Sequence, residues 1–165
     1  MADLLQMAMM LCEFFPQLAN WNLTFIASDL SRDVLQRAKD GRYSAIEVNR
    51  GLPATMLLKY FTKVDSEWEI SPQIRKMIDF REINLTEVWP VMPLLDLVFV
   101  RNVMIYFSHE TKKKILGRIR ALMQPDGFLF LGGSETTLNL DDNFERVPSD
   151  NSGCYRLRPK SAIAA

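Results

Sequence analysis

The stretch "DLVFVRNVMIYFSHETKKKILGRIRALMQPDGFLFLGGSE", from Asp96 to Glu135, carries the clearest structural pattern of this chain. It predicts a buried strand, a polar turn, a helix capped by Ser108, a second turn at "QPDG" and a second buried strand, "FLFLGG". Arg101 and Tyr106 lie on the first turn. Because ligands bind outside the carboxyl ends of strands in open parallel sheets, these polar side chains are candidates for a site.

A second predicted strand, earlier in the chain, also ends at a polar side chain. The apolar run "LTFIAS" predicts a strand buried on both faces, and Asp29 closes it. Ser31 then caps a helix with Val34, Leu35 and Ala38 on one face, and Gly41 ends that helix. Two strand ends with side chains able to reach a ligand favour a nucleotide-type cofactor, although no glycine-rich loop precedes Asp29.

Composition narrows the functional classes. The 165 residues predict one domain, and a formal net charge of zero gives no basic footprint for nucleic acid or an anionic membrane. No apolar run approaches the roughly 20 residues that span a bilayer. Cys12 and Cys154 match no zinc or redox spacing, and His109 is the single histidine, so no metal site is predicted. These features predict a cytoplasmic protein without membrane insertion or a nucleic-acid partner.

The remaining segments complete an α/β pattern. A helix is predicted from about Leu4 to Phe15, and a terminal hairpin with strands around Phe144–Val147 and Cys154–Leu157. Residues 42–80 predict a small antiparallel appendage inserted in the single domain, 1–165. It holds a short helix (Ala54 to Tyr60), the strands "FTKV" and "EWEI" joined by "DS", and the start of a further strand, "MIDFREINL". Alternating strands and helices followed by a hairpin indicate an α/β fold that turns antiparallel at one edge.

With these segments in view, the chain resembles the C-terminal catalytic domain of the CheR chemotaxis receptor methyltransferases. The matching pieces are "FIASDLSRDVLQRAKDGRYS", "LLKYF", "FREINL", "VFVRNVMIYFSHETKKKIL", "LMQPDGFLFLGGSE" and "CYRL". The resemblance implies a Rossmann-like class I methyltransferase sheet, with residues 42–80 as the family's β-subdomain. A small departure is Gly133, where some members carry histidine.

The larger departures concern the start of the domain. The family's N-terminal receptor-binding region, its first strand and its glycine-rich cofactor loop have no match, since the family's "GEEPYSIAMLL" stands where this chain opens "MADLLQMAMMLCEFF". We therefore expect an N-terminally truncated sheet in which "LTFIAS" and "LVFV" each expose an unpaired edge. Direct closure of these strands, a homodimer through the exposed edges, and a form that binds no cofactor all remain open.

The resemblance implies a cofactor site for S-adenosylmethionine, with S-adenosylhomocysteine as the product. Asp29 would accept hydrogen bonds from the ribose hydroxyls, Asn84 and Leu85 would line the adenine pocket, and Val100 and Arg101 would line the cofactor. From the residues alone, Asp29 is equally well a helix cap partner, and Asn84 a turn residue.

Arg101 and Tyr106 are the expected catalytic residues. A glutamate carboxylate is ionised at pH 7, so methyl transfer to it requires orientation and exclusion of water rather than a general base. A guanidinium can hold a carboxylate through two bonds, and Tyr106 adds a hydroxyl donor. The alternatives are a structural salt bridge for Arg101 and an amphipathic edge of the core for Tyr106. Ser134 and Glu135 either support the site or only stabilise a local turn.

Three functions follow from this reading. The first is S-adenosylmethionine-dependent methyl transfer to glutamates on the cytoplasmic helices of chemotaxis receptors, with a receptor tail peptide bound at the β-subdomain as in some members. The second is a non-catalytic protein-binding module. The third is a methyltransferase of the same fold that acts on another acceptor.

Overall fold

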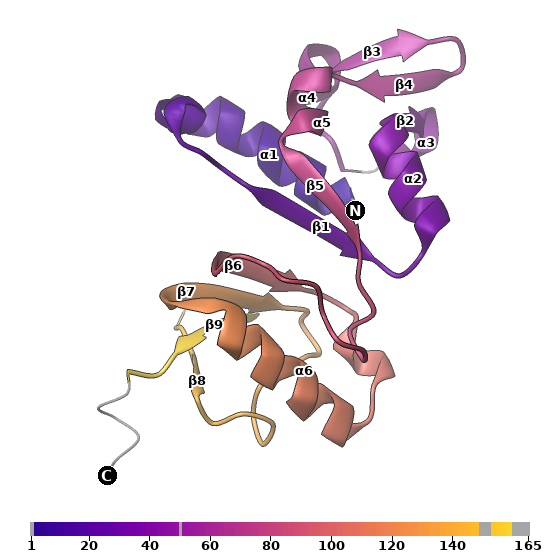
Figure 1. The fold of residues 1–165 in the computed structure, drawn as a ribbon. Helices are drawn as coiled ribbons and strands as arrows, with labels where there is room; N and C mark the ends of the chain where they lie inside the picture. Colours follow the sequence, from indigo (N-terminus) through magenta and orange to yellow (C-terminus); the bar gives the residue numbers. More distant parts are fainter. Residues whose placement is uncertain (1, 50, 149–152, 160–165) are drawn as a thin grey trace. The chain divides into compact units, whose positions relative to one another are not determined.

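The computed structural model describes residues 2–49, 51–148 and 153–159. The chain divides into two compact units, Met1–Asn84 and Leu85–Ala165, each with its own hydrophobic core (Figure 1). Each unit contains one parallel pair of strands flanked by helices. The α/β fold class predicted from the sequence is therefore confirmed.

Two parallel strands and two helices form the base of the first unit. α1 (Ala2–Phe14) leads through the 3₁₀ helix η1 (Pro16–Asn20) to β1 (Phe25–Asp29), and α2 (Arg32–Asp40) follows. β5 (Ile78–Glu82) pairs with β1 in parallel along the whole length of both strands. The carboxyl ends of the two strands therefore lie at the same edge.

The core of the first unit joins α1 to the strands and to the segment between them. α1 is apolar along one face because its hydrophobic residues recur at helical spacing. The buried residues of this core are Leu5, Ala8, Met9, Ala27, Met56, Tyr60, Ile70, Ile74 and Ile78.

A three-stranded antiparallel sheet lies between β1 and β5 in the sequence. Its strands are β2 (Arg42–Ser44), β3 (Phe61–Val64) and β4 (Glu67–Ile70), in the order β2-β4-β3. β3 and β4 have the predicted bounds, and Asp65 takes a left-handed φ of 54° in the turn that joins them. The helices of this segment are α3 (Ala45–Asn49), α4 (Ala54–Tyr60, as predicted) and α5 (Pro72–Lys76).

The predicted caps of α2 are confirmed. Ser31 Oγ accepts a hydrogen bond from the Val34 N–H (3.3 Å), and Gly41 ends the helix in the left-handed region with φ 71°. Of the three residues predicted on one face, Leu35 and Ala38 are buried and Val34 is 42% exposed.

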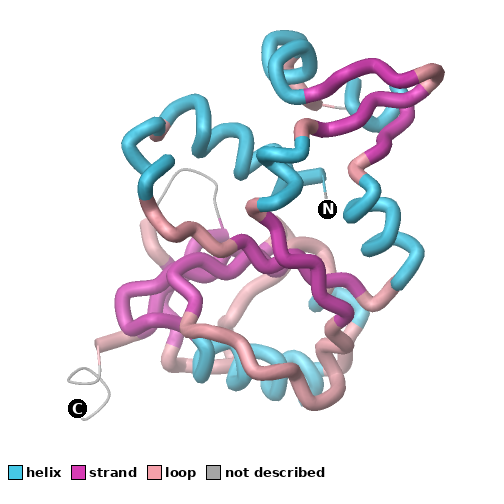
Figure 2. Tube along the Cα trace, turned by 45° about the horizontal axis from the view of Figure 1, so that its top comes forward, coloured by secondary structure: helices cyan, strands magenta, loops and turns pink. Residues whose placement is uncertain are grey.

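The second unit is a four-stranded sheet with the order β6-β7-β9-β8. β6 and β7 are parallel and the other pairs are antiparallel, so the predicted terminal hairpin is confirmed. Figure 1 and Figure 2 show the single long helix of this unit alongside the strands. The elements are β6 (Leu95–Val100), η2 (Met104–Tyr106), α6 (His109–Leu122), β7 (Met123–Leu131), β8 (Phe144–Arg146) and β9 (Gly153–Leu157).

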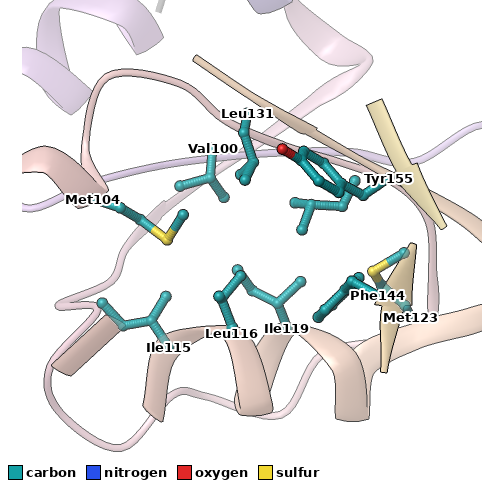
Figure 3. Close-up of a cluster of buried hydrophobic side chains, with 10 residues drawn as sticks. Val100, Met104, Ile115, Leu116, Ile119, Met123, Leu131, Phe144 and Tyr155 are labelled. Atoms are coloured by element: carbon teal, nitrogen blue, oxygen red, sulfur yellow. The ribbon is translucent and has the colours of Figure 1, made fainter. Parts of the chain in front are cut away.

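α6 buries its apolar face against the sheet (Figure 3). Ser108 caps the helix as predicted, accepting the Thr111 N–H at 3.3 Å. Ile115 and Leu116 are fully buried and Ile119 is 2% exposed. The strands and the η2 turn contribute Val100, Met104, Met123, Leu129, Leu131, Phe144 and Tyr155 to the same cluster.

The predicted boundary of the second buried strand is wrong. β7 begins at Met123 rather than after "QPDG". Leu95 lies opposite Met123 and Leu97 opposite Phe128, so residues 124–127 form a bulge between two paired positions. The turn signal is real, but it interrupts a strand that has already begun.

The strands predicted to expose an unpaired edge, β1 and β6, each have one edge without a strand partner in the described ranges. There β1 pairs only with β5, and β6 pairs only with β7. Cys12 and Cys154 are free thiols. Across the same ranges no helix combines the length and hydrophobicity needed to cross a membrane.

Gly41→Ala is expected to lower the free energy of unfolding by about 1–2 kcal/mol, because the left-handed region strains an L side chain. The added Cβ would also meet Ile70 Cγ2 at 2.9 Å and Arg75 Cδ at 3.2 Å. Gly117→Ala is the matched control: it lies inside α6, its Cβ meets nothing within 4 Å, and it should gain up to about 1 kcal/mol from helix propensity. Urea titrations followed by circular dichroism compare the two, and equal midpoints would contradict this account.

Candidate active site

Arg101 and Tyr106 lie on the turn that follows β6. Val100, the last residue of the strand, is buried, and the Arg101 side chain beyond it is exposed. Asn102 takes a left-handed φ of 58°, which turns the chain away from the sheet. Met104, 1% exposed, anchors the turn in the core (Figure 3), whereas Tyr106 is 79% exposed.

The exposure of both side chains argues against the two structural alternatives, a salt bridge for Arg101 and a core edge for Tyr106. Arg101 takes part in no ion pair among the described residues. The Tyr106 ring does not form an edge of the core, because most of its surface is in solvent. Both side chains are thus available to a ligand, and their catalytic roles stay predictions.

The Glu135 carboxylate holds this turn from the neighbouring strand end. Its Oε2 accepts the N–H groups of Asn102 (2.8 Å) and Gly132 (2.7 Å), and its Oε1 accepts those of Val103 (2.9 Å) and Met104 (2.7 Å). Burial raises the pKa of the Glu135 carboxyl, but the four N–H donors outweigh burial and hold the pKa below its ordinary value. Glu135 is therefore an ionised group in the folded protein at neutral pH.

Gly132 completes this arrangement because it has no side chain. A Cβ there would lie 2.6 Å from Asn102 Oδ1, 2.7 Å from Glu135 Oε2 and 2.9 Å from the Asn102 nitrogen. The Gly132 carbonyl also accepts the Glu135 N–H (2.9 Å), which closes a tight turn after β7. Only glycine allows the two strand ends and the carboxylate to approach this closely.

The stability difference between the wild type and Glu135→Gln is expected to shrink as pH falls. The folded-state pKa of Glu135 lies below the unfolded-state value, so ionised Glu135 stabilises fully above the ordinary carboxyl pKa of 4.5. This stabilisation is lost as pH falls through the lower, folded-state pKa. Urea midpoints of both proteins, taken from neutral pH to the acid limit of folding, measure the gap; a gap that widens in acid would contradict the assignment.

Arg118 holds the segment that begins at Leu85. Its Nη1 donates to the carbonyl oxygens of Leu85 (3.0 Å) and Glu87 (2.5 Å), and its guanidinium lies 5.8 Å from the Trp89 ring centroid. Trp89 Nε1 donates to the same Leu85 carbonyl (3.3 Å), and the Leu85 side chain packs against the core of this unit. One α6 side chain thus fixes the backbone of a predicted adenine-lining residue.

Asp29 and Asn84 lie at the carboxyl edge of the β1–β5 pair. Asp29 Oδ1 accepts the Ser31 N–H (2.9 Å), so the cap-partner role is present in the structure. A carboxylate offers about four acceptor positions, so this bond leaves capacity for ribose hydroxyls. The Asp29 carbonyl accepts the Ile83 N–H (3.2 Å), which places Asn84 one residue beyond that bond.

Each unit therefore brings together part of the predicted set. The first unit holds Asp29 and Asn84 at neighbouring strand ends. The second unit holds Val100, Arg101 and Tyr106 on one strand end and turn. Sequence reasoning missed Arg118, and it left the role of Glu135 open, because the partners of Glu135 on the turn lie 31 to 33 residues away.

Comparisons with known proteins agree with the resemblance. Residues 4–152 match the family model described as CheR methyltransferase, SAM binding domain. The chain is 40% identical over 134 residues to chemotaxis protein methyltransferase 1 of Pseudomonas aeruginosa, and 41% identical over 134 residues to chemotaxis protein methyltransferase Cher2 of Pseudomonas putida. A solved structure of LepI in complex with SAM aligns with a TM-score of 0.39 at 16% identity, over 77% of this chain and 24% of that one.

These relatives are longer than this chain. Each alignment covers 81% of the chain but 49% of the relative, so the chain spans about half the length of the curated relatives it matches. The family assignment itself rests on most of the chain, both through the family model and through two relatives of about 40% identity. The chain belongs to the CheR methyltransferase family.

Proposed function

We propose that this protein transfers a methyl group from S-adenosylmethionine to glutamate carboxylates of chemotaxis receptors. The observation that carries the proposal is Arg101, an exposed guanidinium on an anchored turn at the carboxyl end of β6 in a CheR family member. The relatives' names, which describe chemotaxis protein methyltransferases, support the same reaction class.

The reaction requires little proton chemistry from the protein. S-adenosylmethionine, when bound, supplies an electrophilic methyl group on a positively charged sulfur. The acceptor carboxylate is ionised at neutral pH, and one of its oxygens forms the new C–O bond while the S–C electron pair returns to sulfur. The protein's residues therefore have to orient the acceptor and exclude water.

Arg101 and Tyr106 suit the acceptor carboxylate. A guanidinium can donate two parallel hydrogen bonds to a carboxylate, which fixes the oxygen that faces the methyl group. The Tyr106 hydroxyl, on the same turn and in solvent, adds a third donor. The attraction between the Arg101 guanidinium and the acceptor carboxylate is stronger once the receptor surface covers the turn, because water then screens the two charges less.

The chain also offers chemistry that fits the cofactor. Asp29 keeps acceptor capacity for a ribose diol beyond its bond to Ser31. Asn84 carries an amide that can read the edge of an adenine ring, and the half-buried Leu85 beside it offers an apolar side chain. Val100, the last residue of β6, would line the cofactor next to Arg101. We assign cofactor contacts to these four residues and to Arg101, each on the basis of its own chemistry and position in its unit.

A catalytic role is favoured over a non-catalytic binding module. A protein that used only a docking surface would have no need for an exposed arginine on a turn fixed by three backbone hydrogen bonds to one buried carboxylate. A methyltransferase acting on a neutral acceptor would likewise gain little from Arg101. Receptor carboxylates are therefore the acceptor class that we propose.

The first test is calorimetric titration of the folded chain with S-adenosylhomocysteine. We expect binding at micromolar strength, and about tenfold weaker binding by Asp29→Asn, because an amide keeps the acceptor for Ser31 but loses the charge. Asp33→Asn is the matched control, since Asp33 lies in the exposed first turn of α2. No binding by a chain that circular dichroism shows to be folded would overturn the cofactor site.

The proposal extends to domain organisation and location. We propose a single methyltransferase domain over residues 1–165, with 42–80 as an inserted β-subdomain, acting in the cytoplasm.

Exposed strand edges suit two binding partners. β3 is an edge of the β2-β4-β3 sheet, which suits a receptor tail peptide added as a strand. The open edges of β1 and β6 suit a homodimer, and a molecular mass of 19.0 kDa by light scattering, that of one chain, would overturn the dimer.

A further inference from the structure

In the described part of the second unit, one carboxylate accepts four backbone hydrogen bonds, and it belongs to Glu135, which is not among the predicted catalytic or cofactor-binding residues. Glu135 is 8% exposed, and each of its two oxygens accepts two backbone N–H groups at 2.7–2.9 Å. Among the described residues no cationic side chain lowers its pKa, and backbone N–H groups balance the charge. A buried charge held only by main-chain donors fixes backbone conformation, because moving any donor leaves the charge undersatisfied.

The four donors come from two strand ends. Val100 and Leu131, the last residues of β6 and β7, lie opposite each other in the parallel register. Gly132 directly follows β7. β6 is followed first by Arg101 and then by the other three donors, Asn102, Val103 and Met104. The carboxylate therefore ties the turn after β6 to the end of β7.

Arg101 and Tyr106 flank the tied residues. Arg101 immediately precedes the first bound N–H, that of Asn102, and Tyr106 lies two residues beyond the last, that of Met104. Asn102 also keeps a left-handed φ of 58°, a conformation that needs support from its surroundings. Without the carboxylate, three consecutive N–H groups of this turn would lose their partner.

We propose that Glu135 is a positioning residue, whose carboxylate fixes the turn that presents Arg101 and Tyr106 to the acceptor carboxylate. This inference rests on the proposed methyl transfer. Glu135 touches neither reactant: it sets the backbone from which the guanidinium extends. Pre-orientation of this kind raises the rate of the chemical step because the groups that hold the acceptor are already ordered before the reaction begins.

Glu135→Gln tests the proposal with little change in size. Glutamine presents one oxygen, so two of the four N–H groups would face an amide that cannot accept. We expect loss of protection from hydrogen exchange at the 102–104 amides, and upfield shifts of their proton resonances. In transfer assays with a receptor cytoplasmic fragment, kcat is expected to fall at least tenfold while the acceptor KM changes less than threefold.

Two matched pairs separate positioning from general destabilisation. Gly132→Ala should reproduce the loss, because its Cβ would lie 2.7 Å from Glu135 Oε2, whereas Gly133→Ala should not, because its Cβ meets nothing within 4 Å. Leu157→Ala lowers stability from the core of the same unit, at the end of β9 farthest from Gly153 and its partner Leu131, and should keep kcat at an equal loss of thermal midpoint. Glu110→Gln, exposed in the first turn of α6, controls for loss of a surface carboxylate.

The outcomes are distinguishable. Unchanged amide exchange and shifts at 102–104 in Glu135→Gln overturn the positioning role whether or not the chain is active. A kcat that follows the thermal midpoint equally in Glu135→Gln and Leu157→Ala also overturns it. A wild-type chain that transfers no methyl group overturns the proposed function instead, and leaves the effect of Glu135 on the turn to the exchange data.

Discussion

Arg101→Ala is expected to lower methyl transfer to receptor glutamates by a factor of about 10² to 10³, the usual cost of losing a charge-assisted group that orients the reacting atoms. The side chain is exposed and in no ion pair among the described residues, so its removal should leave the fold intact. Transfer of labelled methyl groups into a receptor cytoplasmic fragment, released as methanol by base, measures the rate. Base-stable label would point to a different acceptor.

The substitution series should also separate charge from geometry. Arg101→Lys keeps the positive charge but replaces two parallel donors by a single ammonium, so an intermediate rate is expected. Arg146→Ala, an exposed arginine on β8, is the matched control and should transfer at the wild-type rate. Transfer by Arg101→Ala at the wild-type rate would remove Arg101 from the mechanism.

Leu116→Ala is expected to cost about 2–5 kcal/mol of unfolding free energy, the usual range for a buried leucine. Leu116 is fully buried, and Figure 3 shows it pointing from α6 into the cluster that contains Val100 and Met104. Because domains are stable by only about 5–15 kcal/mol, the loss should move the urea midpoint strongly. The truncation also loosens the support of the Arg101 turn, since Met104 belongs to the same cluster.

Leu138→Ala provides the matched comparison. Leu138 is 70% exposed in the same unit, and truncation there should change the unfolding free energy by less than about 0.5 kcal/mol. Urea denaturation of both variants, followed by far-ultraviolet circular dichroism, makes the comparison. Similar midpoints for the two would show that α6 does not pack as described.

Local signals account for the elements that the sequence predicted well. β6 ends at Val100, directly before the predicted polar turn, because the apolar run gives way to Arg101 within one residue. α2 begins after Ser31 and ends before Gly41 because both caps act within the helix's own backbone. α4 and the hairpin strands β3 and β4 were likewise predicted with their observed bounds.

Missed elements depend on distant partners or on short signals. β2 is a strand of three residues that exists through its pairing with β4, Tyr43 opposite Trp68, and no local period marks it. α5 carries a readable signal, since Ser71 caps it and Pro72 occupies its first position, but its five residues are too few for a periodic pattern. The start of β7 was misplaced because a strong turn dipeptide can also form a bulge.

The candidate site divides in the same way. Asp29, Val100 and Arg101 were predictable because strand ends are visible in the sequence, although their roles remain proposals. Arg118 was missed and the role of Glu135 was left open, because the backbone groups that Arg118 binds, and those that Glu135 binds on the turn after β6, lie 31 to 33 residues away along the chain. Side chains that bind backbone rather than other side chains leave no complementary residue type for a pattern to reveal.

Trp89 can serve as a fluorescence probe of the second unit. Of the three tryptophans, Trp21 and Trp68 belong to the first unit and Trp89 to the second. Its indole lies against the Arg118 guanidinium and donates to the Leu85 carbonyl. With the other two replaced by phenylalanine, fluorescence would come from Trp89 alone, and its emission would report changes at the Leu85 backbone during unfolding or on titration with S-adenosylhomocysteine.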